Sequence, residues 1–191
     1  MKKLDIVLPV LNEENILKKN VMFLYEFLVE NLPYIDWKIV VVDNGSSDFT
    51  QSLGEGLCKE KSNIQYIRLE ERGRGRALKE SWGKSKADLV SYMDIDLSTD
   101  LNHFSELISA ILYDNYDLAI DFGHKLRTIL GINKPPMAPH GLILSENEAI
   151  PSMMLFRLLL GLFEPILCAF LMQIRPQGSG PRKLVIFLFS L

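Results

Sequence analysis

The chain has 191 residues, enough for one well-buried domain, and its hydrophobic share of 48% and charged share of 24% are ordinary for a globular protein. A formal net charge of -3 excludes nucleic acid as the expected partner, because proteins that bind it usually carry a basic excess. Cys58 and Cys168 have no paired spacing, which argues against a disulfide framework and a zinc site. No signal peptide is recognisable after Met1, and we therefore expect a cytoplasmic protein.

Up to about residue 120, short runs rich in Val, Ile and Leu alternate with longer segments of helical periodicity. The predicted strands cover 4–10, 38–42, 64–69, 89–93 and 118–120. The predicted helices follow Asn12 and cover 49–60, 77–84 and 102–115. This alternation predicts an α/β fold, with a mostly parallel sheet and helices on both of its faces.

The first predicted helix has a clear apolar face, formed by Leu17, Val21, Leu24 and Leu28. We expect Asn12 to cap this helix, with Glu13 and Glu14 in its first turn.

Three polar clusters, at 12–14, 43–48 and 94–96, each come directly after a predicted strand. Parallel α/β sheets bind their ligands at the carboxyl ends of the strands. We therefore expect all three clusters to line one edge of the sheet.

Asp94 and Asp96 form the strongest of these signals, because two carboxylates at a strand end can both reach a hard divalent cation. Mg²⁺ or Mn²⁺ prefers oxygen ligands and often bridges to substrate phosphates. Such a cation would neutralise charge on a departing diphosphate. The alternative is a pair of solvated turn carboxylates without a ligand.

The other polar positions are more ambiguous. Asp43 is suited to accept a hydrogen bond from a base or a ribose, or else to form an Asx turn or a helix cap. Glu13 is a site residue or a helix-dipole partner. Arg72 and Arg74 lie in a basic, glycine-rich turn that opens a helix, which suits a phosphate but also a solvated turn.

Four stretches, 5–14, 41–50, 72–77 and 93–99, resemble the inverting glycosyltransferases of family 2, which have the GT-A fold. The branch that they resemble most is that of the dolichol-phosphate (polyprenyl-phosphate) mannosyl- and glucosyltransferases. The resemblance covers about the first 120 residues.

The resemblance implies a role for each matching residue. The implied nucleoside contacts are Pro9, Leu11, Glu13, Val41 and Asp43. The residues implied to be catalytic, holding the metal and the diphosphate, are Asp94 and Asp96, with Ile95 against the nucleotide and Ser98 as a further metal ligand.

The implied reaction transfers a hexose, with inversion, from a nucleotide-sugar donor of the UDP-glucose or GDP-mannose type to a polyprenyl or dolichyl phosphate. A phosphate acceptor is already anionic, which would explain why no general base is evident.

Residues 1–121 are expected to form the nucleotide-sugar-binding core, and residues 122–191 a divergent, Pro-rich and apolar tail. We expect this tail to be truncated or frame-disrupted, or to lie at a membrane surface, which would place the protein at the cytoplasmic face of the membrane. Two alternatives stay open. One is a catalytically impaired fragment that binds nucleotide, and the other is a haloacid-dehalogenase-type phosphatase with Asp94 as its nucleophile.

Overall fold

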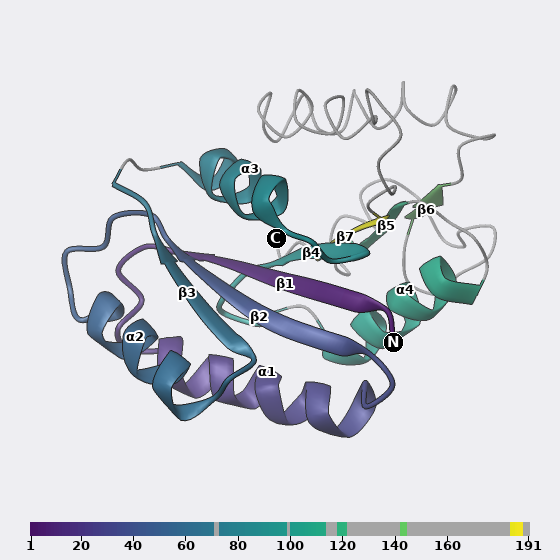
Figure 1. Ribbon diagram of the computed structural model, residues 1–191, viewed down its shortest axis with the longest axis horizontal. Helices are drawn as coiled ribbons and strands as arrows, with labels where there is room; N and C mark the ends of the chain where they lie inside the picture. The colour runs from purple at the N-terminus through teal and green to yellow at the C-terminus, as the bar shows by residue number, and fades with distance from the viewer. Residues whose placement is uncertain (71–72, 99, 114–117, 122–141, 145–183, 189–191) are drawn as a thin grey trace.

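Figure 1 shows the computed structural model, which describes residues 1–70, 73–98, 100–113, 118–121, 142–144 and 184–188. Its strands form a single sheet in the order β3-β2-β1-β4-β7-β5-β6. The strands are β1 (Lys3–Val10), β2 (Asp36–Asp43), β3 (Ile64–Arg68), β4 (Leu89–Met93), β5 (Leu118–Asp121), β6 (Leu142–Leu144) and β7 (Leu184–Leu188). Neighbouring strands are parallel except β5 and β6. The predicted mostly parallel sheet is confirmed.

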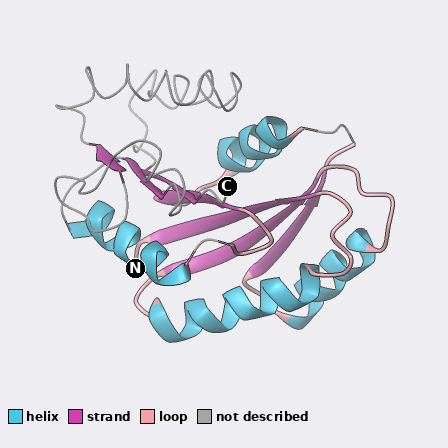
Figure 2. Ribbon diagram, turned by 180° about the vertical axis from the view of Figure 1, so that it is seen from behind, coloured by secondary structure: helices cyan, strands magenta, loops and turns pink. Residues whose placement is uncertain are grey.

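Four helices accompany the sheet in the described part of the chain. They are α1 (Leu17–Asn31), α2 (Thr50–Glu60), α3 (Arg74–Lys84) and α4 (Leu101–Tyr113). The two ribbon views show α1, α2 and α4 on one face of the sheet and α3 on the other (Figures 1 and 2). Helices therefore lie on both faces, as predicted. None of the described helices is long and apolar enough to cross a membrane.

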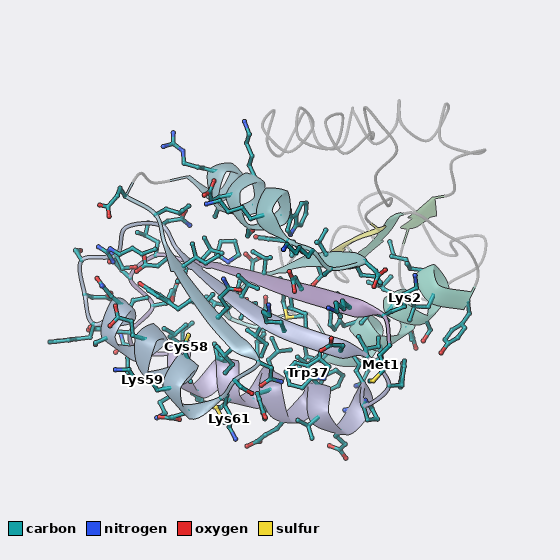
Figure 3. The ribbon with its side chains drawn as sticks, in the orientation of Figure 1. Met1, Lys2, Trp37, Cys58, Lys59 and Lys61 are labelled. Atoms are coloured by element: carbon teal, nitrogen blue, oxygen red, sulfur yellow. The ribbon has the colours of Figure 1, made fainter. Side chains whose placement is uncertain are left out.

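The main hydrophobic core lies between the sheet and the helices α1, α2 and α4. The predicted apolar face of α1 is fully buried there, and its residues are Leu17, Val21, Leu24 and Leu28. Trp37 of β2 lies on the same side of the sheet (Figure 3) and meets the ring of Tyr25 edge-on, with centroids 5.3 Å apart. The 3.6-residue period of α1 thus positions the helix beneath β1 and β2.

The start of α1 differs from the prediction. The helix begins at Leu17, and no acidic residue lies in its first turn. Asn12 therefore does not cap the helix, and Glu13 and Glu14 are not dipole partners within it. Asn12 instead adopts a left-handed backbone conformation, with φ of 57°, in the loop before the helix. Asparagine is one of the few residues that tolerate this region.

Two segments beyond residue 121 belong to the same sheet as the first 121 residues. β7 pairs with β4 on one side and with β5 on the other, and β6 pairs with β5. The sheet therefore extends beyond residue 121, and the expected division into a core and a tail stays a prediction. Most of the tail that was expected to lie at a membrane surface falls outside the described residues.

Two glycines of α2 lie in opposite surroundings. A Cβ at Gly54 would lie 2.3 Å from a ring carbon of Tyr66, whereas a Cβ at Gly56 would meet nothing within 4 Å. We expect Gly56→Ala to raise the free energy of unfolding by about 0.5–1 kcal/mol, because alanine favours a helix. Gly54→Ala should instead lower it by about 1–3 kcal/mol, because the Tyr66 ring must move. Urea denaturation measures both, and stabilisation by both variants would contradict this packing.

Candidate functional site

The strand order reverses at β1: β2 and β3 follow on one side of it, and β4 lies on the other side. Open α/β sheets bind ligands at such a switch point, beyond the carboxyl ends of the strands. β1, β2 and β4 are parallel, and the loops that follow them begin at Leu11, Asn44 and Asp94. The structure therefore brings the three predicted polar clusters to one edge of the sheet.

Hydrogen bonds join the loop after β1 to the loop after β2. The N–H of Asn12 donates to Ser46 Oγ at 2.9 Å, and Asn12 Oδ1 accepts the N–H of Ser47 at 2.8 Å. The N–H of Glu13 donates to Thr50 Oγ1 at 2.8 Å. Much of the polarity of these two loops thus serves to hold them together.

Glu14 and Asp48 extend this connection to the start of α2. Glu14 Oε2 accepts the N–H of Phe49 at 2.9 Å, and Asp48 accepts the N–H groups of Glu14 and Thr50 at 3.2 and 3.0 Å. Burial acts to raise the pKa of Asp48, but the hydrogen bonds from Thr50 and Glu14 outweigh it and lower this pKa. Glu14 and Asp48 therefore satisfy backbone donors at the N-terminus of α2 rather than of α1.

Asp43 is fully buried at the end of β2, and both of its carboxylate oxygens have partners. Oδ1 accepts the N–H and the hydroxyl of Ser46 at 2.8 and 2.6 Å. Oδ2 accepts the hydroxyl of Tyr66 and the guanidinium of Arg68, the latter at 2.9 Å. Burial raises the pKa of Tyr66, and the hydrogen bond to Asp43 raises it further. Asp43 closes the loop after β2 through the N–H three residues on, rather than the two residues of the Asx turn expected as an alternative. A base N–H would have to share or displace one of these donors.

Asp94 and Asp96 follow β4 at the switch point. Asp94 is half-buried and its Oδ1 accepts the hydroxyl of Tyr92. Asp96 is exposed and its Oδ1 accepts the N–H and the hydroxyl of Ser98 at 3.2 and 2.9 Å. Within the described residues, each carboxylate keeps its Oδ2 free of hydrogen bonds, and neither forms an ion pair.

This donor set fits a divalent cation that shares its ligands with a phosphate. No group of three or more His, Cys, Asp and Glu side chains among the described residues could hold a metal by itself. Mg²⁺ in phosphate-transfer sites is usually held by only one or two carboxylates, with phosphate oxygens and water completing the shell. Asp94 and Asp96 supply these carboxylates. The hydroxyl of Ser98, the further predicted ligand, donates a hydrogen bond to Asp96.

The other residues implied to contact the nucleotide are distributed between the edge and the core. Leu11 is 38% exposed, and Pro9 and Glu13 are half-buried at the same edge. The side chains of Val41 and Ile95 are buried in the core, at 0% and 5% exposure. Leu11, Pro9 and Glu13 are therefore accessible at this edge, whereas the side chains of Val41 and Ile95 are not accessible.

The basic turn is described only in part. Arg72 and the side chain of Arg74 lie outside the described residues. The helix α3 begins at Arg74, three residues before the predicted start at Ala77. Part of the predicted glycine-rich turn is therefore the first helical turn of α3. Gly73 precedes the helix with φ of 151°, a conformation that favours glycine.

Three residues at this edge were not predicted from the sequence. Tyr66 and Arg68 hold the carboxylate of Asp43, and Asn20 of α1 donates to the carbonyl of Ile95 at 2.9 Å. The alternation of Tyr66 and Arg68 along β3 places them on one face of the strand. The register of β3 against β2, which pairs Arg68 with Asp43, is not visible in the sequence.

Two curated relatives match the part of the chain that contains this site. Glycosyltransferase AglD of Haloferax volcanii is 30% identical over 118 residues, which are 61% of this chain and 19% of the relative. The dolichyl-phosphate beta-glucosyltransferase of Saccharomyces cerevisiae is 27% identical over 114 residues, 56% of this chain and 34% of the relative. The match thus spans about a fifth and a third of the lengths of these relatives.

Solved structures share the fold. The mannosyltransferase PcManGT from Pyrobaculum calidifontis, solved with GDP-Man and Mn²⁺, superposes with a TM-score of 0.56 and 17% identity, over 69% of this chain and 38% of that one. Glucosyl-3-phosphoglycerate synthase from Mycobacterium tuberculosis, solved with Mn²⁺, UDP and phosphoglyceric acid, has a TM-score of 0.53 and 18% identity. The superposition covers 98% of this chain and 68% of the synthase chain. The fold is therefore of the GT-A type.

The family model described as glycosyl transferase family 2 matches residues 5–153, which is more than half of the chain. The match contains all four stretches that carried the resemblance and the whole of the edge described above. The phosphatase alternative is thereby set aside. The chain belongs to glycosyl transferase family 2.

Proposed function

We propose that this protein binds a nucleotide-sugar donor together with Mg²⁺ or Mn²⁺ and transfers the hexose, with inversion, to a polyprenyl or dolichyl phosphate. The observation that carries the proposal is the pair Asp94 and Asp96 at the end of β4. Among the residues that the structure describes, no donor bonds to the second carboxylate oxygen of either residue, and both lie at the switch point beside the loop after β1. This is where a parallel α/β sheet binds a nucleotide.

In this proposal Asp94 and Asp96 hold the cation and orient the diphosphate of the donor. A bound cation would supply charge neutralisation to the departing nucleoside diphosphate. Pro9, Leu11 and Glu13 border the nucleoside, because these residues are accessible at the same edge. Asp43 contributes through the loop that it organises, since its oxygens are already occupied by Ser46, Tyr66 and Arg68.

The chemistry of the reaction and one curated relative support the proposed acceptor. An acceptor phosphate oxygen attacks the anomeric carbon while the bond from that carbon to the diphosphate breaks, which inverts the configuration. The attacking oxygen is already an anion, and this step needs no base from the protein. The name of the yeast relative, a dolichyl-phosphate beta-glucosyltransferase, supports an acceptor of this class.

Calorimetry with UDP and GDP, each with and without Mn²⁺, tests the donor half of the proposal. We expect Mn²⁺ to strengthen the binding of at least one nucleotide by about tenfold or more, because the cation joins the carboxylates to the diphosphate. Equal affinity with and without Mn²⁺ for both nucleotides would contradict it.

Incubation of the full chain with labelled UDP-glucose or GDP-mannose and a polyprenyl phosphate tests the acceptor half. Labelled lipid product is the expected result. Metal-dependent nucleotide binding without any product would favour the second candidate, a nucleotide-binding fragment that does not transfer sugar.

A further inference from the structure

The two aspartates of the candidate metal site are joined by a turn with an unusual backbone. The N–H of Leu97 donates to the carbonyl of Asp94 at 3.2 Å, which closes the turn. Leu97 itself has φ of 51°, a left-handed conformation that is rare for a bulky side chain. A backbone held in such a conformation persists only when its surroundings determine it.

One side chain from another element fixes this turn. Asn20 Nδ2 donates to the carbonyl of Ile95, between the two aspartates, at 2.9 Å. The other hydrogen bonds of residues 94–98 within the described part of the chain come from the turn itself or from neighbouring Tyr92. Asn20 is half-buried, and it lies on a helix held in place by the fully buried side chains of Leu17 and Val21.

We propose that Asn20 is a positioning residue for the metal and diphosphate site. Its amide holds the Ile95 carbonyl, and the side chain of Ile95 is buried at 5% exposure. A hydrogen bond to the Ile95 carbonyl and the packing of the Ile95 side chain therefore both constrain the backbone between Asp94 and Asp96. This fixes the spacing of the two carboxylates before any cation binds, and the inference rests on the function proposed above. Groups that orient metal ligands in this way typically affect metal affinity by about 10–100-fold.

Asn20→Asp tests this role, because aspartate has nearly the same shape but no N–H to donate. Asn20→Ala is the second variant, since alanine favours a helix and should leave α1 intact. Asn31→Asp is the matched control. Asn31 lies on the same helix and its Nδ2 donates to the Phe27 carbonyl at 2.9 Å, at the end of α1 away from the site.

The measurement is nucleotide affinity by calorimetry on the full chain, with and without Mn²⁺, together with the urea midpoint of each variant. We expect both Asn20 variants to lose about tenfold or more of the Mn²⁺-dependent gain in affinity. Their metal-free affinity should stay within about twofold of the unsubstituted chain, and Asn31→Asp should match that chain in both conditions.

Three outcomes would overturn the inference. One is a full Mn²⁺-dependent gain in both Asn20 variants, which would overturn the positioning role alone. The second is an equal loss with and without Mn²⁺, or a loss that follows the urea midpoint, which would assign Asn20 a merely structural role. The third is the absence of any Mn²⁺-dependent gain in the unsubstituted chain, which would overturn the proposed function and this inference with it.

Discussion

Asp96→Asn should abolish the Mn²⁺-dependent part of nucleotide binding and leave the protein folded. Asp96 is exposed, and its hydrogen bonds in the described structure are with Ser98. Removing a surface carboxylate usually changes the free energy of unfolding by no more than about 0.5 kcal/mol. Replacing a metal ligand should weaken metal-dependent binding by about 100-fold or more, since loss of a group that only orients a ligand weakens it by about 10–100-fold. Calorimetry and urea denaturation measure the two effects separately.

Asp100→Asn is the control for this variant. Asp100 is also exposed, and its Oδ1 accepts the N–H of Asn102 at 2.9 Å, in the same manner as Asp96 accepts that of Ser98. Nucleotide binding by this control should be unchanged with and without Mn²⁺. If Asp96→Asn unfolded the protein, or if both variants lost binding equally, Asp96 would be a structural residue and the assignment wrong.

Asp43→Ala should destabilise the whole domain, in contrast to Asp96→Asn, which should lose metal-dependent binding without losing stability. The substitution leaves the donors of Ser46, Tyr66 and Arg68 without their acceptor in a region where Asp43 is fully buried. Each buried donor left unsatisfied costs about 1–3 kcal/mol. Arg68 keeps 30% of its side chain exposed, and water can replace part of its lost bond. We therefore expect the free energy of unfolding to fall by about 3 kcal/mol in urea denaturation.

Asp36→Ala provides the comparison, because Asp36 lies at the exposed beginning of the same strand. Asp36→Ala should change the free energy of unfolding by no more than about 0.5 kcal/mol. A loss below about 1 kcal/mol for Asp43→Ala would show that the four hydrogen bonds to its carboxylate contribute little to folding. Asp43 would then be open to a role in binding the nucleoside directly.

The sequence predicted the strands and helices best where one buried face determines them. β4 was predicted to the residue, from Leu89 to Met93, because a buried apolar run ends abruptly at Asp94. The buried positions of α1 were predicted from their spacing alone. The spacing of apolar residues indicates which face of a helix or strand is buried. The core of the first 120 residues could therefore be predicted from the sequence.

Polar residues were harder to interpret, because their partners lie far along the chain. Asn12 was expected to cap its own helix, but it binds Ser46 and Ser47 in the next loop. Asp43 was interpreted either as a nucleoside contact or as a residue of a local turn or cap, and neither interpretation included Tyr66 and Arg68, which reach it from β3. A side chain that can form a local cap can equally form a distant hydrogen bond, and spacing does not distinguish the two.

The candidate site was predicted in outline because the carboxyl ends of parallel strands share one edge. Asp94 and Asp96 could be placed at this edge from the order of strands and polar clusters along the chain. Asn20 could not, because a single asparagine in a helix carries no signal of which backbone carbonyl it meets. The placement of β7 was missed for a related reason, since an apolar strand does not specify its neighbours in the sheet.

The position of β7 has a consequence for how the protein is synthesised. β5 joins the rest of the sheet through β7, which pairs with β4 from Leu89↔Leu184 onward. During translation, the edge of β4 stays unpaired until residues 184–188 leave the ribosome, and pairing between strands so far apart in the sequence is slow. An unpaired strand edge is a template for association with other chains. The nascent chain should therefore depend most on chaperones in the interval between the synthesis of β4 and that of β7.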